Sequence, residues 1–199
     1  ANREANHLTT WITIAAYISL FVATALAYRL PPADGYEASI YRVYPWYFWG
    51  ALVVTILLGQ FTILRSARRI DPPNGRWKLG FGAILLANVL LLSVPILRGY
   101  PSYGRGDSLT HVGTIRDIQS TGAIPAGDFY PGLHTIQLAA SYATGIDLVG
   151  IVNIFPPIIS ILALISLFLL FTQLFTSRRK VLFSIVFTSV LLYQVAHVN

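Results

Sequence analysis

Apolar residues occur along this chain in long blocks and not in short alternating patterns. Five blocks carry few or no charges, and they cover residues 8–29, 44–64, 79–97, 148–176 and 181–198. The apolar core of a bilayer is about 30 Å thick, so a helix needs roughly 20 apolar residues to cross it. The pattern therefore predicts an all-α fold, a polytopic transmembrane helical bundle of about five spans.

The polar connections divide the chain into three parts. Residues 1–97 hold three predicted transmembrane helices, and residues 148–199 hold two more. Residues 98–147 form a connection that is too long for a simple turn between neighbouring helices. Loops of more than about 15 residues are usually functional or disordered, so this segment is the first place to look for chemistry.

Two local features of the blocks carry structural expectations. Pro156 and Pro157 lie in the first third of the fourth block, where two missing backbone N–H groups predict a kink or an unwound turn. A run of aromatic residues opens the second block, namely Tyr44, Trp46, Tyr47, Phe48 and Trp49. Aromatic rings gather at the level of the lipid headgroups, so we expect an aromatic belt, with a carbohydrate-stacking platform as the alternative.

The composition agrees with a membrane protein. Hydrophobic residues make up 55% of the chain and charged residues 11%, with a mean hydropathy of +0.62. Soluble domains carry roughly 25% charged residues. The absence of cysteine excludes a thiolate nucleophile, a disulfide framework and a cysteine metal site. In a soluble protein the net charge of +6 would suggest nucleic acid, but here the basic residues flank apolar blocks, so we expect the lipid bilayer as partner and no nucleic acid.

The distribution of charge predicts how the spans are oriented. The connection 65–78 is strongly basic, with a single acid at Asp71, and the connection 177–180 holds Arg178, Arg179 and Lys180 without any acid. Two spans separate these connections, so both lie on one side, which the positive-inside rule makes cytoplasmic. We therefore predict a multi-pass protein of the cell membrane with a cytoplasmic N-terminus, and we place residues 29–42 and 98–147 outside.

The long outer loop has a periodicity of its own. Apolar residues at Leu109, Val112, Ile115 and Ile118 fall on one half of a helix, which predicts an amphipathic helix over residues 108–120. A second, mostly apolar stretch predicts a helix over 132–145 that is too short to cross the bilayer. We interpret both as interfacial helices with a polar face turned to water or to a cavity.

Residues capable of acid–base chemistry occur in the same loop. Asp107 and His111 are four residues apart, so they project from the same side of the first helix. Asp128 opens the second half of the loop, ahead of His134. In the simplest interpretation Asp107 caps a helix, Asp128 forms a turn and the histidines are interfacial polar residues. An acid with two histidines also suggests a metal site, but D-x-x-x-H is a weak signal for a divalent cation, and the cofactor stays open.

Three segments of the loop resemble a known family. They are residues 106–113 (GDSLTHVG), residues 115–124 and residues 128–134 (DFYPGLH). Their order and spacing within residues 98–176 resemble the first extracytoplasmic loop of the GT-C membrane glycosyltransferases, which include protein O-mannosyltransferases, oligosaccharyltransferases and lipid A aminoarabinose transferases. Archaeal members look most similar, and residues 31–41 (PPADGYEASIY) add to the resemblance.

The resemblance implies transfer of a sugar from a polyprenyl-phosphate-linked donor, dolichyl phosphate in an archaeon, to an extracytoplasmic acceptor. Asp107 would match the family's catalytic acidic residue and act as the general base. Asp128 would be the second acid, which positions the acceptor or a cation. The other candidates for substrate binding are His111, Arg116, His134 and Tyr130. Among them arginine is the better phosphate partner, because its planar fork is always charged.

The sequence departs from the family at several points. Ser108 stands where the mannosyltransferases carry a second acid, and two spans precede the span that resembles the family's first. The helices that bind the lipid carrier in the family do not follow, so a complete catalytic unit is not in view. Because the sequence begins without Met and ends directly after an apolar run, we expect the N-terminal part of a longer protein, with a small five-helix protein processed at its start as the alternative. The alternative to the enzyme is a non-catalytic scaffold or receptor-like membrane protein. A transporter subunit is less favoured, because the interiors of the spans hold no ionisable residue apart from His197.

Overall fold

A computed structural model of the chain describes residues 2–34, 40–68, 75–100 and 107–195, with side chains described except for residues 2–6, 40–41, 107–108 and 188–195. Several residues used above lie outside the described residues, namely 35–39, Arg69, Asp71, Gly106 and His197. The described part contains eight helices: α1 (Asn2–Arg29), α2 (Ile40–Val43), α3 (Trp46–Ala67), α4 (Arg76–Leu97), α5 (Asp107–Thr121), α6 (Pro131–Thr144), α7 (Leu148–Leu174) and α8 (Arg178–Val195).

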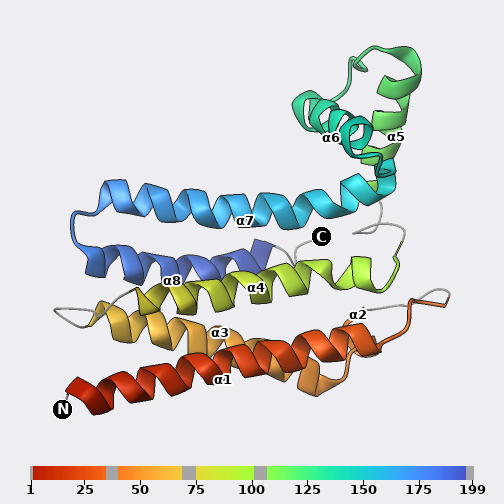
Figure 1. Cartoon of the computed structure of the whole chain (residues 1–199). Helices are drawn as coiled ribbons and strands as arrows, with labels where there is room; N and C mark the ends of the chain where they lie inside the picture. Colours follow the sequence, from red (N-terminus) through yellow and green to blue (C-terminus); the bar gives the residue numbers. More distant parts are fainter. Residues whose placement is uncertain (1, 35–39, 69–74, 101–106, 196–199) are drawn as a thin grey trace.

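The five long helices form an antiparallel bundle. Figure 1 shows α1, α3, α4, α7 and α8 running in alternating directions, and α4 joins the α1–α3 pair to α7. Four helical segments are long and apolar enough to cross a membrane, namely His7–Arg29, Trp46–Ala67, Arg76–Leu97 and Leu148–Leu174. The chain is therefore a helical membrane protein. The fifth span stays a prediction, because α8 begins with three basic residues and is not among these four.

The two ends of the bundle differ in chemistry. At one end α3 stops and α4 starts, α7 is connected to α8, and the N-terminus lies nearby (Figure 1). Basic side chains collect there, and the guanidinium of Arg178 lies 5.9 Å from the centre of the Trp77 ring. At the opposite end, Arg98 is buried and its Nη1 donates a hydrogen bond to the Pro31 carbonyl. The segment after α1 is thereby fixed to the end of α4.

Small and hydroxylated residues allow close helix contacts. The α3 and α4 backbones approach at Gly59 and Gly80, where a methyl group added to Gly80 would lie 2.7 Å from the Gly59 carbonyl oxygen. The Ser19 hydroxyl of α1 donates to the Ala51 carbonyl of α3 at 2.9 Å. Lipid is as apolar as the helices themselves, so close packing and hydrogen bonds of this kind replace the hydrophobic effect in holding the bundle together.

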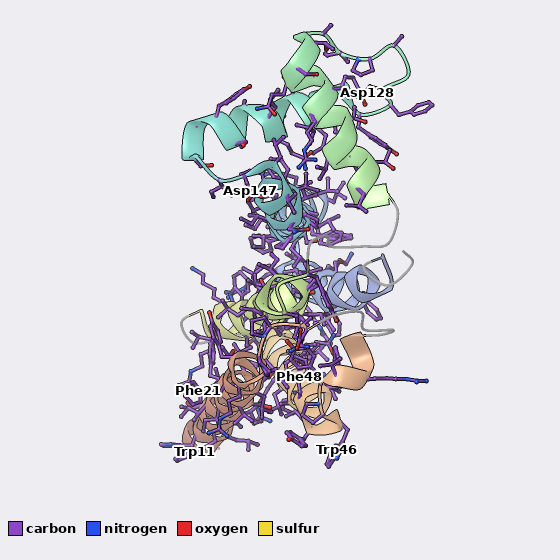
Figure 2. The ribbon with its side chains drawn as sticks, turned by 90° about the vertical axis from the view of Figure 1, so that its right-hand side faces the viewer. Trp11, Phe21, Trp46, Phe48, Asp128 and Asp147 are labelled. Carbon is purple, nitrogen blue, oxygen red and sulfur yellow. The ribbon has the colours of Figure 1, made fainter. Side chains whose placement is uncertain are left out.

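Two sequence expectations are corrected. α7 is helical without interruption through Pro156 and Pro157, so the predicted unwound turn is wrong. The aromatic residues at and just before the start of α3 do not all face the same way. Tyr44 and Phe48 lie in the core and are 2% and 0% exposed, whereas Trp46 is 81% exposed. Figure 2 shows Phe48 inside the bundle and Trp46 at its edge. The belt interpretation therefore does not hold for Tyr44 and Phe48, because helix rotation and not sequence position decides which rings face outward.

Candidate functional site

The long loop folds into a small lobe, formed by α5, α6 and their connection 122–130, which we call the α5–α6 lobe. The two helices cover Asp107–Thr121 and Pro131–Thr144, compared with the expected ranges 108–120 and 132–145. Figures 1 and 2 show both helices beyond the start of α7, with axes that cross the direction of the long helices. This orientation is compatible with interfacial helices, whose depth in a membrane stays a prediction.

An apolar core of its own holds the α5–α6 lobe against α7. Val112 and Ile115 of α5 are buried against Leu148 and Val152 at the start of α7. These contacts follow the helical periodicity of the sequence. Leu109, on the same apolar half of the helix, is 57% exposed and takes no part in this core. The packing fixes the rotation of α5, and with it the direction in which His111 points.

Local turn chemistry places Asp128 at the start of α6. One carboxylate oxygen of Asp128, Oδ1, accepts a hydrogen bond from the Tyr130 N–H at 2.8 Å, which closes an Asx turn. Pro131 then occupies the first turn of the helix, where its missing N–H costs nothing. His134 follows one turn into α6 and is 3% exposed. The order Asp-x-x-Pro-x-x-His therefore brings the carboxylate and the imidazole to the same place.

A chain of hydrogen bonds links three of the candidate residues. The Nδ1 atom of His134 lies 2.8 Å from Oδ2 of Asp128. On the other side of the ring, Nε2 of His134 lies 2.7 Å from Nδ1 of His111, which comes from α5. The Tyr130 ring packs edge-on against His111, with centroids 5.6 Å apart. Figure 2 places Asp128 in the lobe, well away from the core of the bundle.

The carboxylate is the anionic end of this chain. The side chains of His134 and Asp128 are 3% and 1% exposed, so neither is well solvated. Burial by itself would raise the pKa of Asp128. The hydrogen bonds from His134 and the Tyr130 N–H, with the positive charge that His134 and His111 can carry, outweigh burial and lower this pKa below its usual value. Asp128 is thus both the turn former of the simplest interpretation and an ionised partner for His134.

The remaining candidates do not all join this cluster. Arg116 lies on an exposed part of α5, and no hydrogen bond places it with the histidines. The side chain of Asp107 lies outside the described residues, although its backbone begins α5. Among the described residues no group of histidine and acidic side chains is arranged to hold a metal ion. Two imidazole nitrogens 2.7 Å apart share a proton and leave no room for a cation between them.

Gln137 is a further polar residue that the sequence reasoning missed. It lies three residues after His134 on α6, is 3% exposed, and its Oε1 has no hydrogen-bond partner among the described residues. Buried amides are normally hydrogen-bonded, so this oxygen is an unusual feature of the buried face of α6. The three-residue spacing from His134 was the available signal, but it does not reveal burial.

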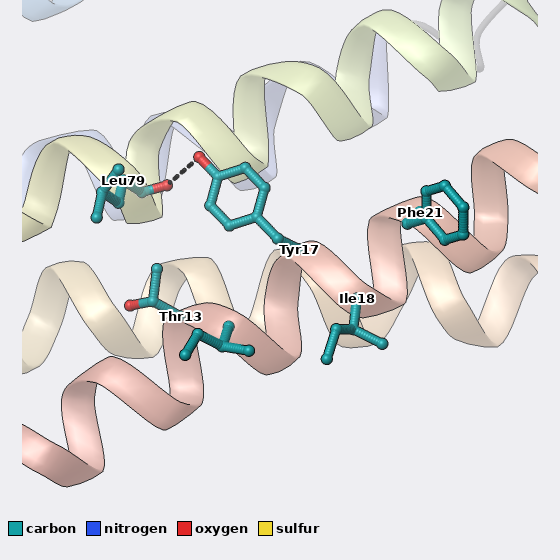
Figure 3. A pocket seen from close by; sticks show the side chains of 6 residues that line it. Thr13, Tyr17, Ile18, Phe21 and Leu79 are labelled. Carbon is teal, nitrogen blue, oxygen red and sulfur yellow. Dashed lines mark hydrogen bonds between the residues drawn. The ribbon is translucent and has the colours of Figure 1, made fainter.

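A separate hollow lies on the membrane-spanning part of the molecule. It is an open groove of about 460 Å³ beside α1 and the start of α4, lined mainly by apolar side chains. Figure 3 shows Tyr17 in this groove, where its hydroxyl donates a hydrogen bond to the Leu79 carbonyl at 3.1 Å. The residues that line it include no Asp, Glu, Lys, Arg or His.

In comparisons with known proteins, the chain matches no family model, no curated protein and no solved structure.

Proposed function

We propose that this protein is a GT-C-type membrane glycosyltransferase, or the N-terminal module of one. It transfers a sugar from a polyprenyl-phosphate-linked donor to an acceptor on the extracytoplasmic side. The observation that carries the proposal is the hydrogen-bonded chain Asp128–His134–His111 in the α5–α6 lobe. Residues from both halves of the loop meet there, and the loop is the segment whose motifs resemble the family.

The chemistry requires a base, a positioned acceptor and a site for phosphate. Asp107 is proposed as the general base, which takes the proton of the acceptor's hydroxyl as its oxygen attacks the anomeric carbon. The bond between that carbon and the phosphate oxygen breaks, and its electron pair leaves with the phosphate. Asp128 and Tyr130 are proposed to position the acceptor. Arg116 is exposed on α5 and is proposed to meet the anionic phosphate.

The proposed location is the cell membrane, with the N-terminus in the cytoplasm. Supporting this orientation, the basic side chains Arg65, Arg68, Arg76, Lys78, Arg178, Arg179 and Lys180 lie at or near the helix ends of one end of the bundle. The positive-inside rule assigns that end to the cytoplasm. The α5–α6 lobe is at the other end, where a lipid-linked donor and an extracytoplasmic acceptor would meet.

The experiment measures sugar transfer by the full chain in liposomes that contain polyprenyl-phosphate-linked sugars, with a radiolabelled sugar to follow the product. Asp107→Asn is expected to lower the rate by on the order of 100-fold or more, because general-base catalysis contributes at least that much. Asp117→Asn is the matched control, since Asp117 is an exposed acid on the same helix. Transfer that is unchanged in Asp107→Asn would exclude this residue as the base, and no transfer by the unmodified chain with any donor would refute the proposed function.

A further inference from the structure

We propose that Asp128, His134 and His111 form a proton relay that takes up one proton at His111 and holds it on His134, opposite the Asp128 carboxylate. The inference rests on the proposed function only for the origin of that proton. The hydrogen-bond geometry of the three side chains carries the rest, and it restricts which nitrogen of each ring can hold a proton.

The order of donors starts at the carboxylate. Asp128 is ionised and can only accept, so the 2.8 Å contact requires a proton on Nδ1 of His134. In a neutral His134 ring the other nitrogen, Nε2, then has a lone pair. Its contact with Nδ1 of His111 at 2.7 Å requires one proton between the two nitrogens, and this proton must therefore belong to His111. Both neutral rings thus carry their proton on Nδ1.

Adding a proton reverses the second hydrogen bond. When a proton binds Nε2 of His111, the proton on Nδ1 of His111 passes to Nε2 of His134. His134 is then an imidazolium that donates to Asp128 and to His111, and His111 is again neutral. One N–H bond breaks and two form, so the pair gains a single proton and no other reactant is needed. The positive charge ends on the ring that touches the carboxylate.

The two histidines cannot take up a second proton while the hydrogen bond between them is intact. If both rings were imidazolium ions, two N–H groups would face each other across 2.7 Å, and the hydrogen bond between His134 and His111 would break. The hydrogen bond between the rings therefore couples their protonation states, which belong to the pair and not to either ring. His111 is half-buried and His134 is buried, so His111 is the member nearer to solvent.

The surroundings favour the charge on His134. The ionisable side chains on the elements around it are Asp107, His111, Arg116 and Asp117 of α5, Asp128 and Tyr130 of the connection, Tyr142 of α6, and Asp147 at the start of α7. Of those with described side chains, His111, Asp128 and Tyr130 face His134. Asp128 is the acid among these three, which makes it the positioning residue that orients His134 and balances its charge.

In the proposed reaction, the relay restores the base. The proton that Asp107 takes from the acceptor must leave this carboxylate before the next turnover. His111 follows Asp107 by one turn of α5, so the proton passes to Nε2 of His111 and is held on His134. It leaves again through Nε2 of His111 to solvent or to the departing phosphate, and this release empties the relay for the next turnover. His111 and His134 are thus assigned a part in turnover rather than in holding the sugar.

The test is nitrogen NMR of the full chain in lipid nanodiscs, labelled with ¹⁵N-histidine. The chain has four histidines, and the substitutions His7→Gln and His197→Gln leave His111 and His134 as the only signals. At high pH both rings are expected to be protonated on Nδ1. On acidification one ring becomes protonated on both nitrogens, the other moves its proton from Nδ1 to Nε2, and the pair takes up one proton in place of two.

Two spectroscopic results would overturn the relay: a proton on Nε2 of neutral His134, or independent uptake of a proton by each ring over the same pH range. Asp128→Asn is expected to abolish the coupled signature, whereas Asp117→Asn keeps it. If Asp128→Asn fails to fold, the spectra of the protein with unchanged Asp128, His134 and His111 still decide whether the relay exists.

Sugar transfer separates the relay from the proposed function. His111→Gln and His134→Gln are expected to lower kcat by about 100-fold and to leave KM unchanged, because proton transfer and not binding is lost. If both variants transfer sugar at the normal rate, the role of the relay in turnover is refuted and the enzyme assignment stands. If the coupled signature is present but the unmodified chain transfers no sugar, the relay stands and the proposed function fails.

Discussion

The contact between Gly59 and Gly80 makes a quantitative prediction about how the bundle is held together. A methyl group at Gly80 would lie 2.7 Å from the Gly59 carbonyl oxygen, and one at Gly59 would lie 2.8 Å from the Gly80 carbonyl oxygen. Ordinary contact begins at 3.4 Å, so α3 and α4 must separate by about 0.7 Å to admit the methyl group at Gly80. At Gly80 the nearest clashing atom is a backbone oxygen, which a change of rotamer cannot move, and at Gly59 the methyl group would also lie 2.8 Å from Cγ1 of Ile84.

The expected size of the effect follows from two opposing contributions. Overpacking of a well-packed contact costs about 1–3 kcal/mol. Replacing glycine by alanine inside a helix stabilises the helix by about 1 kcal/mol. Gly80→Ala should therefore destabilise the protein by about 0–2 kcal/mol, and it should be about 1–3 kcal/mol less stable than a glycine-to-alanine change at an open helix position. Gly50→Ala is the matched control on α3, because nothing lies within 4 Å of a methyl group there, and this variant should be as stable as the unmodified protein or slightly more stable.

The assay is unfolding in mixed detergent micelles with increasing dodecyl sulfate, followed by far-ultraviolet circular dichroism. The double variant of Gly59 and Gly80 should lose less stability than the two single losses added together, because helices already separated by one methyl group accept the second more easily. If Gly80→Ala and Gly50→Ala unfold at the same dodecyl sulfate content, the close approach of α3 and α4 does not exist, and the explanation of their packing is wrong.

Three further predictions concern single side chains. Asp128 has a lowered pKa in the folded protein, so its carboxylate stabilises the α5–α6 lobe. This stabilisation is complete above about pH 4, the usual pKa of aspartate, and is lost as the pH falls through the lowered pKa. The protection of peptides that contain Tyr130, taken relative to the intrinsic exchange rate at each pH, should therefore fall in acid, and Asp128→Asn should remove this pH dependence of the protection. Gln137→Leu removes a buried oxygen that has no hydrogen-bond partner in the part of the chain that the structure describes, so thermal unfolding should show unchanged or higher stability. A loss above about 1 kcal/mol would mean that the amide has a partner. Tyr17→Phe loses the hydrogen bond to the Leu79 carbonyl and should cost about 0.5–1 kcal/mol in the dodecyl sulfate assay.

The sequence by itself was sufficient for features that depend on one segment at a time. The apolar blocks correspond to long helices because the thickness of a bilayer sets the length of a span, whatever the neighbouring helices do. Helix ends in the loop are also local: Gly122 and Gly145 adopt φ values of 68° and 71° just after α5 and α6, and Pro131 begins α6. The pairing of Asp128 with His134 is local too, because six residues and one turn bring the two side chains together, but it was not among the predictions.

Features that depend on how helices rotate and cross were decided by the tertiary structure. His111 and His134 are 23 positions apart, and they meet only because α5 and α6 both pack against the start of α7. Periodicity gives the faces of a single helix but not the partner of each face, so it could not predict the exposure of Leu109 or the burial of Phe48. The sequence determined which residues are available for chemistry in the loop, and the packing of three helices decided that His111 and His134 meet.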